Sequence, residues 1–228
     1  MSWFDKLYKT FIEDDRYKWL LDGLKNTLLI TLGALLIGVI IGSAIAMVKY
    51  FCDDSEKLRV FSWMCDVYTT VIRGIPVTVL LLVFFFIIFS SAENGVPVAI
   101  VAFGINSGAY MAELIRSGIN AIDKGQMEAA RSLGMSKLQA MFKIILPQAV
   151  KNILPAIGNE CIALLKETSV AGYVAVVDIT KAATNIRNKT YDAVNPILLL
   201  AIVYLVMVVV LTKLLTILER RLRKSDGN

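Results

Sequence analysis

The sequence predicts an all-α integral membrane protein with five transmembrane helices, and three observations carry that prediction. Hydrophobic residues make up 57% of the 228-residue chain, and the mean hydropathy is +0.65. Charged residues make up only 19%, which is too little to cover the surface of a water-soluble domain. The hydrophobic residues also gather into charge-free runs of about 20, the length that a helix needs to cross a bilayer core of ~30 Å.

Composition narrows the chemistry that the chain can perform. It contains no histidine, which removes the commonest general base and the commonest metal ligand. Its cysteines, Cys52, Cys65 and Cys161, form no Cys-x-x-Cys pair, so we expect small apolar fillers, not a disulfide framework or a metal site. A net charge of +5 in so apolar a chain favours cytoplasmic loops and anionic lipid over nucleic acid.

Residues 1–19 mix aromatic side chains with charges of both signs and lack the short apolar core of a signal peptide. The spacing of Trp3, Phe4, Phe11 and Trp19 predicts an amphipathic helix that lies at the membrane interface.

Five hydrophobic stretches follow, and we expect each to cross the membrane: about 24–49, 59–91, 97–117, 150–177 and 193–219.

Glycine and proline mark special positions in the first two stretches. Gly33, Gly38 and Gly42 recur at helical spacing, which either lets a neighbouring helix approach closely or reflects the frequency of glycine in membrane helices. In the second stretch Pro76 follows Arg73-Gly74-Ile75, and a proline there frees a backbone carbonyl and kinks the helix.

The fourth stretch is the least regular. It holds Glu160, Lys166 and Glu167, together with Pro155 and Gly158. Charges are costly in lipid, so we expect this helix to face protein or water.

A polar loop, about 119–147, separates the third and fourth stretches. Asp123 can cap the first turn of a helix, and Gly134 can end that helix in the left-handed conformation. Ser136 and Gln139 form a capping box for a second helix, which we expect to end at Leu146-Pro147. This pair of short helices either fills a groove on a soluble partner or rests on the bilayer.

Orientation follows from the distribution of lysine and arginine. Five spans place the two ends of the chain on opposite sides of the membrane. The segments on the side of the C-terminus, including the basic tail 221–228, carry more lysine and arginine than those on the other side. We therefore expect a multi-pass protein of the cell membrane with its C-terminus in the cytoplasm and its N-terminus outside, although the basic residues of 1–19 oppose this orientation.

The loop resembles the signature of a known family. Glu128-Ala129-Ala130, with Gly134 and Ile145-Leu146-Pro147 downstream, resembles the "EAA" motif of ATP-binding-cassette (ABC) importer permeases. Further segments resemble the polar amino acid branch, which takes up substrates such as histidine, arginine, glutamine and glutamate: Arg73-Gly74-Ile75-Pro76, Ala109-Tyr110-Met111-Ala112-Glu113 with Arg116, Gly125-Gln126, and Leu164-Leu165-Lys166-Glu167-Thr168-Ser169. The sequence departs from the family pattern at Asp123, where proline is usual, and at Glu167, where aspartate is common.

The resemblance implies a type I importer permease with the MetI-like fold over residues 20–220. Residues 123–142 would form the coupling helix, which docks in a cleft of an ATPase. The resemblance assigns this contact to Gly125, Gln126, Glu128, Ala129, Ala130, Arg131, Gly134 and Met135.

The same resemblance implies several partners. They are two ABC ATPase subunits, a second permease subunit that is either identical or similar, and an extracytoplasmic binding protein that delivers the amino acid. The chain has no Gly-x-x-x-x-Gly-Lys-Ser/Thr loop, so we expect it to be a transport subunit that binds no cofactor. ATP and Mg²⁺ would act on the partner ATPase.

Intramembrane charges are the candidates for substrate contact. Glu160 suits an ammonium or cationic side chain, or else it forms a structural pair with Lys166 or another neighbour. Arg73 suits a carboxylate, or else it reaches the interface or pairs with another subunit. Asn159 lies ~100° from Glu160 around a helix, so both face one cavity only if the lumen is wide. Thr168 and Ser169 either contact substrate or form a gate or kink. We assign Tyr110, Glu113 and Arg116 to helix packing.

Three other functions compete with an ATP-driven importer. An ion-gradient-driven carrier or channel for small polar solutes would transport without an ATPase, but no inverted repeat is visible. The charges in the fourth span oppose a scaffold without a substrate path, and no hydrolase motif supports a membrane enzyme.

Overall fold

A computed structural model describes residues 3–52 and 59–224, and every regular element within these ranges is a helix. The predicted all-α membrane fold is therefore confirmed. The longer helices are α2 (Tyr17–Cys52), α3 (Arg59–Gly74), α5 (Gly95–Asn120), α8 (Leu146–Glu167), α9 (Ile179–Thr190) and α10 (Asn195–Lys224). The shorter ones are α1 (Trp3–Leu7), η1 (Tyr8–Ile12), η2 (Glu13–Asp15), α4 (Val77–Val83), η4 (Phe84–Ile88), α6 (Lys124–Ser132), α7 (Lys137–Ala140), η5 (Met141–Ile145) and η6 (Thr168–Tyr173).

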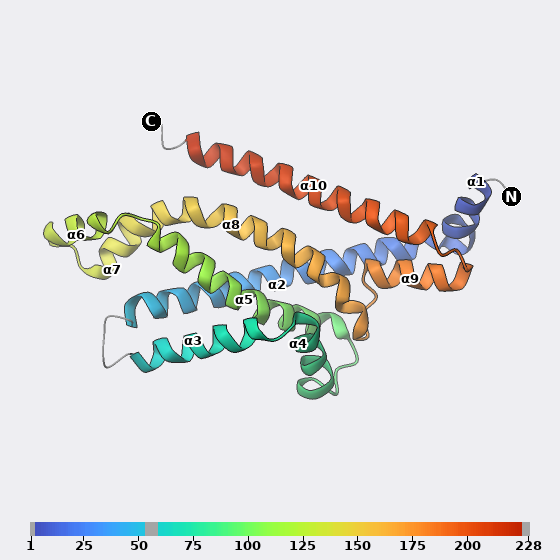
Figure 1. The fold of residues 1–228 in the computed structure, drawn as a ribbon, viewed down its shortest axis with the longest axis horizontal. Coiled ribbons are helices and arrows are strands. Elements are labelled where there is room, and N and C mark those ends of the chain that lie inside the picture. The colour runs from blue at the N-terminus through green and yellow to red at the C-terminus, as the bar shows by residue number, and fades with distance from the viewer. Residues whose placement is uncertain (1–2, 53–58, 225–228) are drawn as a thin grey trace.

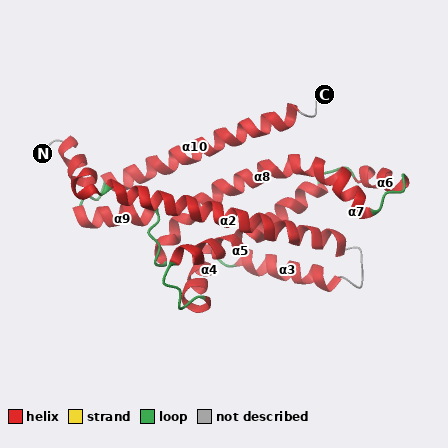
Figure 2. Cartoon of the chain, turned by 180° about the vertical axis from the view of Figure 1, so that it is seen from behind, coloured by secondary structure: helices red, strands yellow, loops and turns green. Residues whose placement is uncertain are grey.

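The helices form an elongated bundle with two distinct ends (Figure 1). Helices α6 and α7 lie at one end, together with the end of α10, whereas α1 and α9 lie at the other. Figure 2 shows the same arrangement from behind. We refer to these as the α6 end and the α9 end. The first and last described residues thus lie at opposite ends of the bundle, as an odd number of spans requires.

Within the described residues, four helical segments are long and apolar enough to cross a membrane: Tyr17–Cys52, Gly95–Asn120, Lys137–Tyr173 and Asn195–Leu222. The predicted span 59–91 is not a single helix. Its two parts, α3 and Val77–Ile88, meet at an angle of 104°. Pro76 stands at the bend and has no amide hydrogen to continue the ladder of α3.

The N-terminal segment differs from the single amphipathic helix predicted for 1–19. Helix α1 is followed by η1 and η2, and positive φ angles of 56° at Asp14 and at Asp15 break the segment before α2 begins at Tyr17. Trp3, Phe4 and Tyr8 are exposed, as an interfacial segment requires. Trp19 belongs instead to α2, because the break separates it from the other aromatic residues.

Helices α2 and α5 pack against each other along most of their lengths. A Cβ atom added to Gly42 would lie 2.4 Å from Cβ of Met111, and one added to Gly38 would lie 2.8 Å from the hydroxyl of Ser107. On the opposite helix, Gly104 faces Ile37 in the same way. The glycines therefore mark a close helix contact, and not merely the composition of a membrane helix.

The fourth span begins earlier than predicted, and Leu146-Pro147 does not end the helix before it. The helical segment runs from Lys137 to Tyr173 without a break. A π-turn, η5, precedes Pro147, and the amide of Leu146 donates to the carbonyl of Met141. The wider π-turn accommodates Pro147, which has no amide hydrogen, in the first turn of α8.

Helix α9 lies in a segment to which the sequence analysis assigned no element. Asp178 caps it by accepting from the amides of Thr180 and Lys181, at 2.9 and 3.1 Å. The helix is fixed on α2, because Thr27 accepts from the amide of Ile179 and Asn26 donates to the carbonyl of Val177. This helix forms a cover over the α9 end of the bundle.

The close α2–α5 contact makes a direct prediction for stability. Gly42→Ala would force the two helices apart, and overpacking of this kind costs about 1–3 kcal/mol. We expect a lower midpoint of thermal unfolding in detergent. Gly74→Ala is the control, because a Cβ atom there meets nothing within 4 Å. Equal midpoints for wild type and Gly42→Ala would show that the contact is looser than described.

Candidate functional site

The loop between α5 and α8 folds as the capping residues predict. The side chain of Asp123 accepts from the amide of Gly125 at 2.6 Å and begins α6. Ser136 and Gln139 form both bonds of a capping box at the start of α7. Both caps satisfy amide groups that a helix start leaves without an internal partner.

Gly134 ends α6 with a φ of +86°. Its amide donates to the carbonyl of Arg131, and the amide of Met135 donates to the carbonyl of Ala130. This pair of bonds is the Schellman arrangement, which favours glycine at the left-handed position. The Arg131 guanidinium donates to the carbonyl of Met135 at 3.3 Å and strengthens the same turn.

The structure distributes the predicted coupling residues over two sides of α6. Ala130 is buried and faces the bundle. Glu128 lines a cavity beneath the helix and is also exposed. The remaining residues are exposed: Gly125, Gln126, Ala129, Arg131, Gly134 and, in part, Met135.

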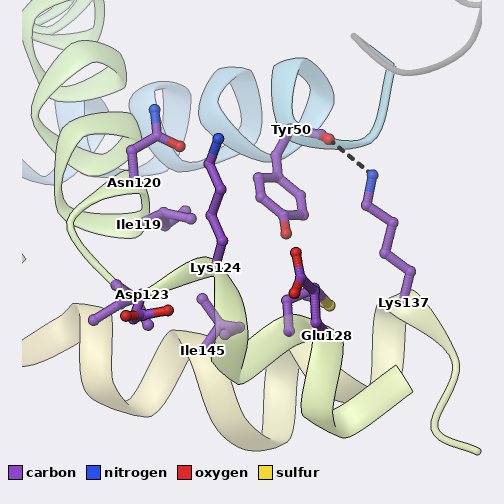
Figure 3. Close-up of a pocket in the computed structure, with 10 residues that line it drawn as sticks. Tyr50, Ile119, Asn120, Asp123, Lys124, Glu128, Lys137 and Ile145 are labelled. Carbon is purple, nitrogen blue, oxygen red and sulfur yellow. Dashed lines mark hydrogen bonds between the residues drawn. The ribbon is translucent and has the colours of Figure 1, made fainter. Parts of the chain in front are cut away.

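The cavity beneath α6 has a volume of about 600 Å³ and lies between α6 and the ends of α2 and α5. Figure 3 shows Glu128, Lys124 and Tyr50 directed into it from opposite walls. Asp123 and Lys137 also line this space. Charged groups of both signs thus surround an open cavity behind the exposed surface of the loop.

The tip of the loop also exposes large apolar side chains that the sequence analysis did not select. Leu133 is 85% exposed, and Leu138 and Phe142 are exposed by more than half. Such side chains next to Ala129 form an apolar patch on a polar loop, which is typical of a protein contact. Their spacing around Gly134 could have revealed them, because Leu133 and Leu138 flank the end of one helix and the start of the next.

The intramembrane charges Glu160 and Arg73 meet the same turn of α5. The hydroxyl of Ser107 donates to the carboxylate of Glu160 at 3.2 Å, and Glu160 is partly buried. Arg73 places its guanidinium 5.1 Å from the ring centre of Tyr110. Ser107 and Tyr110 are three residues apart and hence neighbours on one helix surface.

The structure pairs Glu160 with a neighbour on α5, and its role as a substrate contact stays a prediction. The carboxylate contacts Ser107 of α5, whereas the side chain of Lys166 is exposed, so the structure does not form the Glu160–Lys166 pair. On α5, Ser107 contacts Glu160 and the ring of Tyr110 contacts Arg73. The sequence analysis missed Ser107 and assigned Tyr110 to packing, because nothing in the sequence indicates which residues of the third span face Glu160 and Arg73.

A polar stripe follows one face of α8. Asn152, Asn159 and Lys166 recur every seven residues, and all three are exposed. Such side chains are costly against lipid, so this face requires a cover of protein or water. Asn159 therefore points to a different side from Glu160, as the angle between adjacent helix positions predicts.

Thr168 and Ser169 lie where α8 changes to the tighter helix η6. Thr168 is fully buried, and its hydroxyl donates to the carbonyl of Leu165 at 2.7 Å. Ser169 lines a cavity of about 330 Å³ at the α9 end. Asp178, Thr180 and Lys181 line the same cavity.

Two carboxyl groups at the α9 end have shifted pKa values. Burial raises the pKa of Asp178, which the amides and hydroxyl of its helix cap only partly offset. For Asp192, burial opposes the charge, but hydrogen bonds from Asn195, Thr10 and Val194 outweigh it and lower the pKa. Asp192 thereby fixes η1 to the start of α10, since Thr10 donates to it at 2.9 Å.

The comparisons with known proteins agree on one family. Residues 34–224 match the family described as binding-protein-dependent transport system inner membrane component. The chain is 36% identical over 219 residues to the arginine transport system permease protein ArtQ of Bacillus subtilis, with 91% of this chain and 94% of that protein covered. It is 35% identical over 209 residues to the putative glutamine transport system permease protein GlnP of Rickettsia bellii, with 90% and 93% covered.

Solved structures show the same fold. The crystal structure of an amino acid ABC transporter with histidines contains a chain that is 40% identical, with a TM-score of 0.83 and coverage of 92% of this chain and 98% of that one. The inward-facing MetNI methionine ABC transporter contains a chain with a TM-score of 0.78 over 90% of this chain and 96% of that one. At 19% identity, the second likeness concerns the fold alone.

The helical bundle with its capped loop therefore defines a transport subunit of the membrane, and the chain belongs to the family of binding-protein-dependent transport system inner membrane components. The resemblance to ABC importer permeases and the MetI-like fold are both confirmed.

The left-handed turn at Gly134 generates a prediction that separates backbone strain from steric clash. A Cβ atom at Gly134 meets nothing within 4 Å, so only its positive φ restricts substitution. Gly134→Val should cost about 1–2 kcal/mol through strain, because a β-branched residue rarely adopts this conformation. Gly134→Asn should cost much less. Proteolysis rates at the loop in detergent measure the difference; equal rates for both variants would contradict the described turn.

Proposed function

We propose that this chain is the permease subunit of an ATP-driven importer for a polar amino acid. The observation that carries the proposal is the convergence of Glu160 and Arg73 on one turn of α5. The names of the relatives, which include an arginine permease and a putative glutamine permease, support the same substrate class.

The two charges match the two ends of an amino acid. A carboxylate such as Glu160 binds an ammonium or a cationic side chain, and a guanidinium such as Arg73 binds a carboxylate. Asn159, Thr168 and Ser169 remain predicted contacts along the same span. Because Glu160 is the intramembrane acid nearest the centre of α8, neutral and cationic polar substrates are favoured over acidic ones.

The α6 end faces the cytoplasm in this proposal, and the α9 end faces outward. Two ABC ATPase subunits, which bind ATP and Mg²⁺, dock at this end of the importer. On each permease chain the contact surface is the exposed side of α6 together with the apolar patch Leu133, Leu138 and Phe142. A binding protein delivers the amino acid at the α9 end. The higher count of lysine and arginine on the α6 side supports this orientation.

A second permease subunit covers the polar stripe of α8. Asn152, Asn159 and Lys166 then line a path between the two copies and avoid lipid. Movement of the ATPase subunits displaces α6, and α5 transmits the displacement because only Ala121, Ile122 and Asp123 separate the two helices. The bundle thereby alternates between inward- and outward-facing states.

Substitution of Glu160 tests the substrate site. Glu160→Gln keeps the shape and removes the charge, and the loss of a charge-assisted hydrogen bond should weaken substrate binding roughly ten- to a hundredfold. The measurement is amino acid binding by the purified complex, with uptake in proteoliposomes alongside. Glu219→Gln, near the end of α10, controls for the loss of one carboxylate. Unchanged affinity and selectivity in Glu160→Gln would remove this residue from the site.

Substitution of Glu128 tests the ATPase contact. Glu128→Lys reverses a charge on α6, and we expect normal membrane insertion with ATP hydrolysis no longer coupled to uptake. Ser132→Ala, on the same helix, is the control. The experiment uses proteoliposomes that contain the permease, its ATPase and the binding protein. Normal uptake by Glu128→Lys would contradict the coupling role, and uptake by wild type without any ATPase would favour an ion-gradient-driven carrier.

A further inference from the structure

The last turn of α2 presents two aromatic rings to the α6 end of the bundle. Tyr50 and Phe51 lie at right angles, with ring centres 5.3 Å apart and an interplanar angle of 86°. Both rings pack against an apolar cluster that includes Met127 of α6 and Met141 of η5. The end of the first span therefore reaches the underside of the loop that α6 and α7 form.

Lys137, the first residue of α7, occupies the corner between these rings. Its ammonium nitrogen lies 5.0 Å from the ring centre of Tyr50 and 5.7 Å from that of Phe51. The same nitrogen is 3.5 Å from the carbonyl oxygen of Tyr50, and Figure 3 shows the side chain extended from α7 toward the end of α2. We call these three interactions the Lys137 contact.

Two features of the site that Lys137 occupies attract a cation. The faces of aromatic rings carry negative charge and attract an ammonium group. Tyr50 is also two residues from the end of α2 at Cys52, where carbonyl groups lack an intrahelical donor and the helix dipole is negative. The ring and carbonyl interactions therefore act on one ammonium group in the same direction.

The Lys137 contact joins α7 to α2 by a polar interaction, beside the apolar packing of Tyr50 and Phe51 on the loop. Within residues 3–52 and 59–224, α2 and α7 do not lie along each other, and the side chain of Lys137 spans the gap between them. Helix α6 is joined to α5 by the chain itself, whereas α7 follows the left-handed turn at Gly134. Helix α7 continues through η5 into α8, and the Lys137 contact adds to this connection a direct link between α7 and α2.

We propose that Lys137 is a positioning residue that couples α7 to the first membrane span, so that the whole loop and the α2–α5 pair move as one unit. This inference rests on the proposed function and adds to it a second route from the loop to the membrane helices. Displacement of the loop reaches α5 through α6 and reaches α2 through the Lys137 contact.

The test compares coupling efficiency in proteoliposomes that contain the permease, its ATPase and the binding protein. The quantity measured is the number of ATP molecules hydrolysed for each amino acid accumulated. Lys137→Met keeps an apolar stem and removes the charge, and Lys137→Arg keeps both the charge and the attraction to the rings. Tyr50→Leu combined with Phe51→Leu removes the partners. Lys143→Met removes another exposed positive charge from the same helical segment.

We expect Lys137→Met and the double leucine variant to hydrolyse more ATP for each amino acid than wild type, with unchanged assembly. Loss of the cation–ring contact should weaken the link between α7 and α2 by roughly tenfold. Lys137→Arg and Lys143→Met should match wild type. Wild-type ratios in Lys137→Met, or an equal defect in Lys143→Met, would overturn the inference.

A second measurement does not depend on transport. A thiol cross-linker joins Cys52 to a cysteine introduced at Leu138, in a chain that lacks Cys65 and Cys161. We expect efficient cross-linking, which falls when Lys137→Met is added and recovers with Lys137→Arg. An unchanged yield in Lys137→Met would overturn the inference even where the transport assay agrees. If wild type fails to couple uptake to ATP hydrolysis, the proposed function fails, while the cross-link still reports whether Lys137 fixes the loop to α2.

Discussion

The close approach of α2 and α5 is the constraint on which the rest of the structure depends. Gly38 and Gly42 bring the backbone of α2 against Ser107 and Met111, so the two helices behave as a single rigid unit. Ser107 lies within this contact, and it is also the residue that binds Glu160 of α8. The packing that stabilises the bundle therefore also positions the charge that we assign to the substrate.

This rigid pair explains why both ends of the bundle can respond together. At the α6 end, α5 leads directly into the capped loop, and the aromatic end of α2 contacts Lys137. At the α9 end, α2 holds α9 through Thr27 and Asn26. A force applied to the loop is thus delivered to a continuous body that runs the length of the molecule, and α4 joins that body after the bend before Pro76, because Leu81 packs in one core with Ile30 and Phe103.

Sequence reasoning succeeded where structure is local. Asp123, Gly134 and Ser136 act through neighbours within a few residues, so their caps could be predicted from spacing alone. It failed where distant parts decide the outcome: the sequence contains no sign that Glu160 meets Ser107, or that α9 packs on α2. The π-turn before Pro147 was missed for another reason, because proline usually ends a helix unless the preceding turn widens.

The distinction between local and distant contacts also limits what one copy of the chain can do. The stripe of Asn152, Asn159 and Lys166 exposes polar groups along a helical segment that is long and apolar enough to cross a membrane, and the lipid core offers no hydrogen-bond partners. A single bundle would lose much of the free energy gained by inserting its apolar helices, unless water or a second subunit covers this face. In the proposed importer the substrate path is therefore a property of an assembly: each chain would supply one polar wall, and the cost of exposing that wall to lipid would favour association.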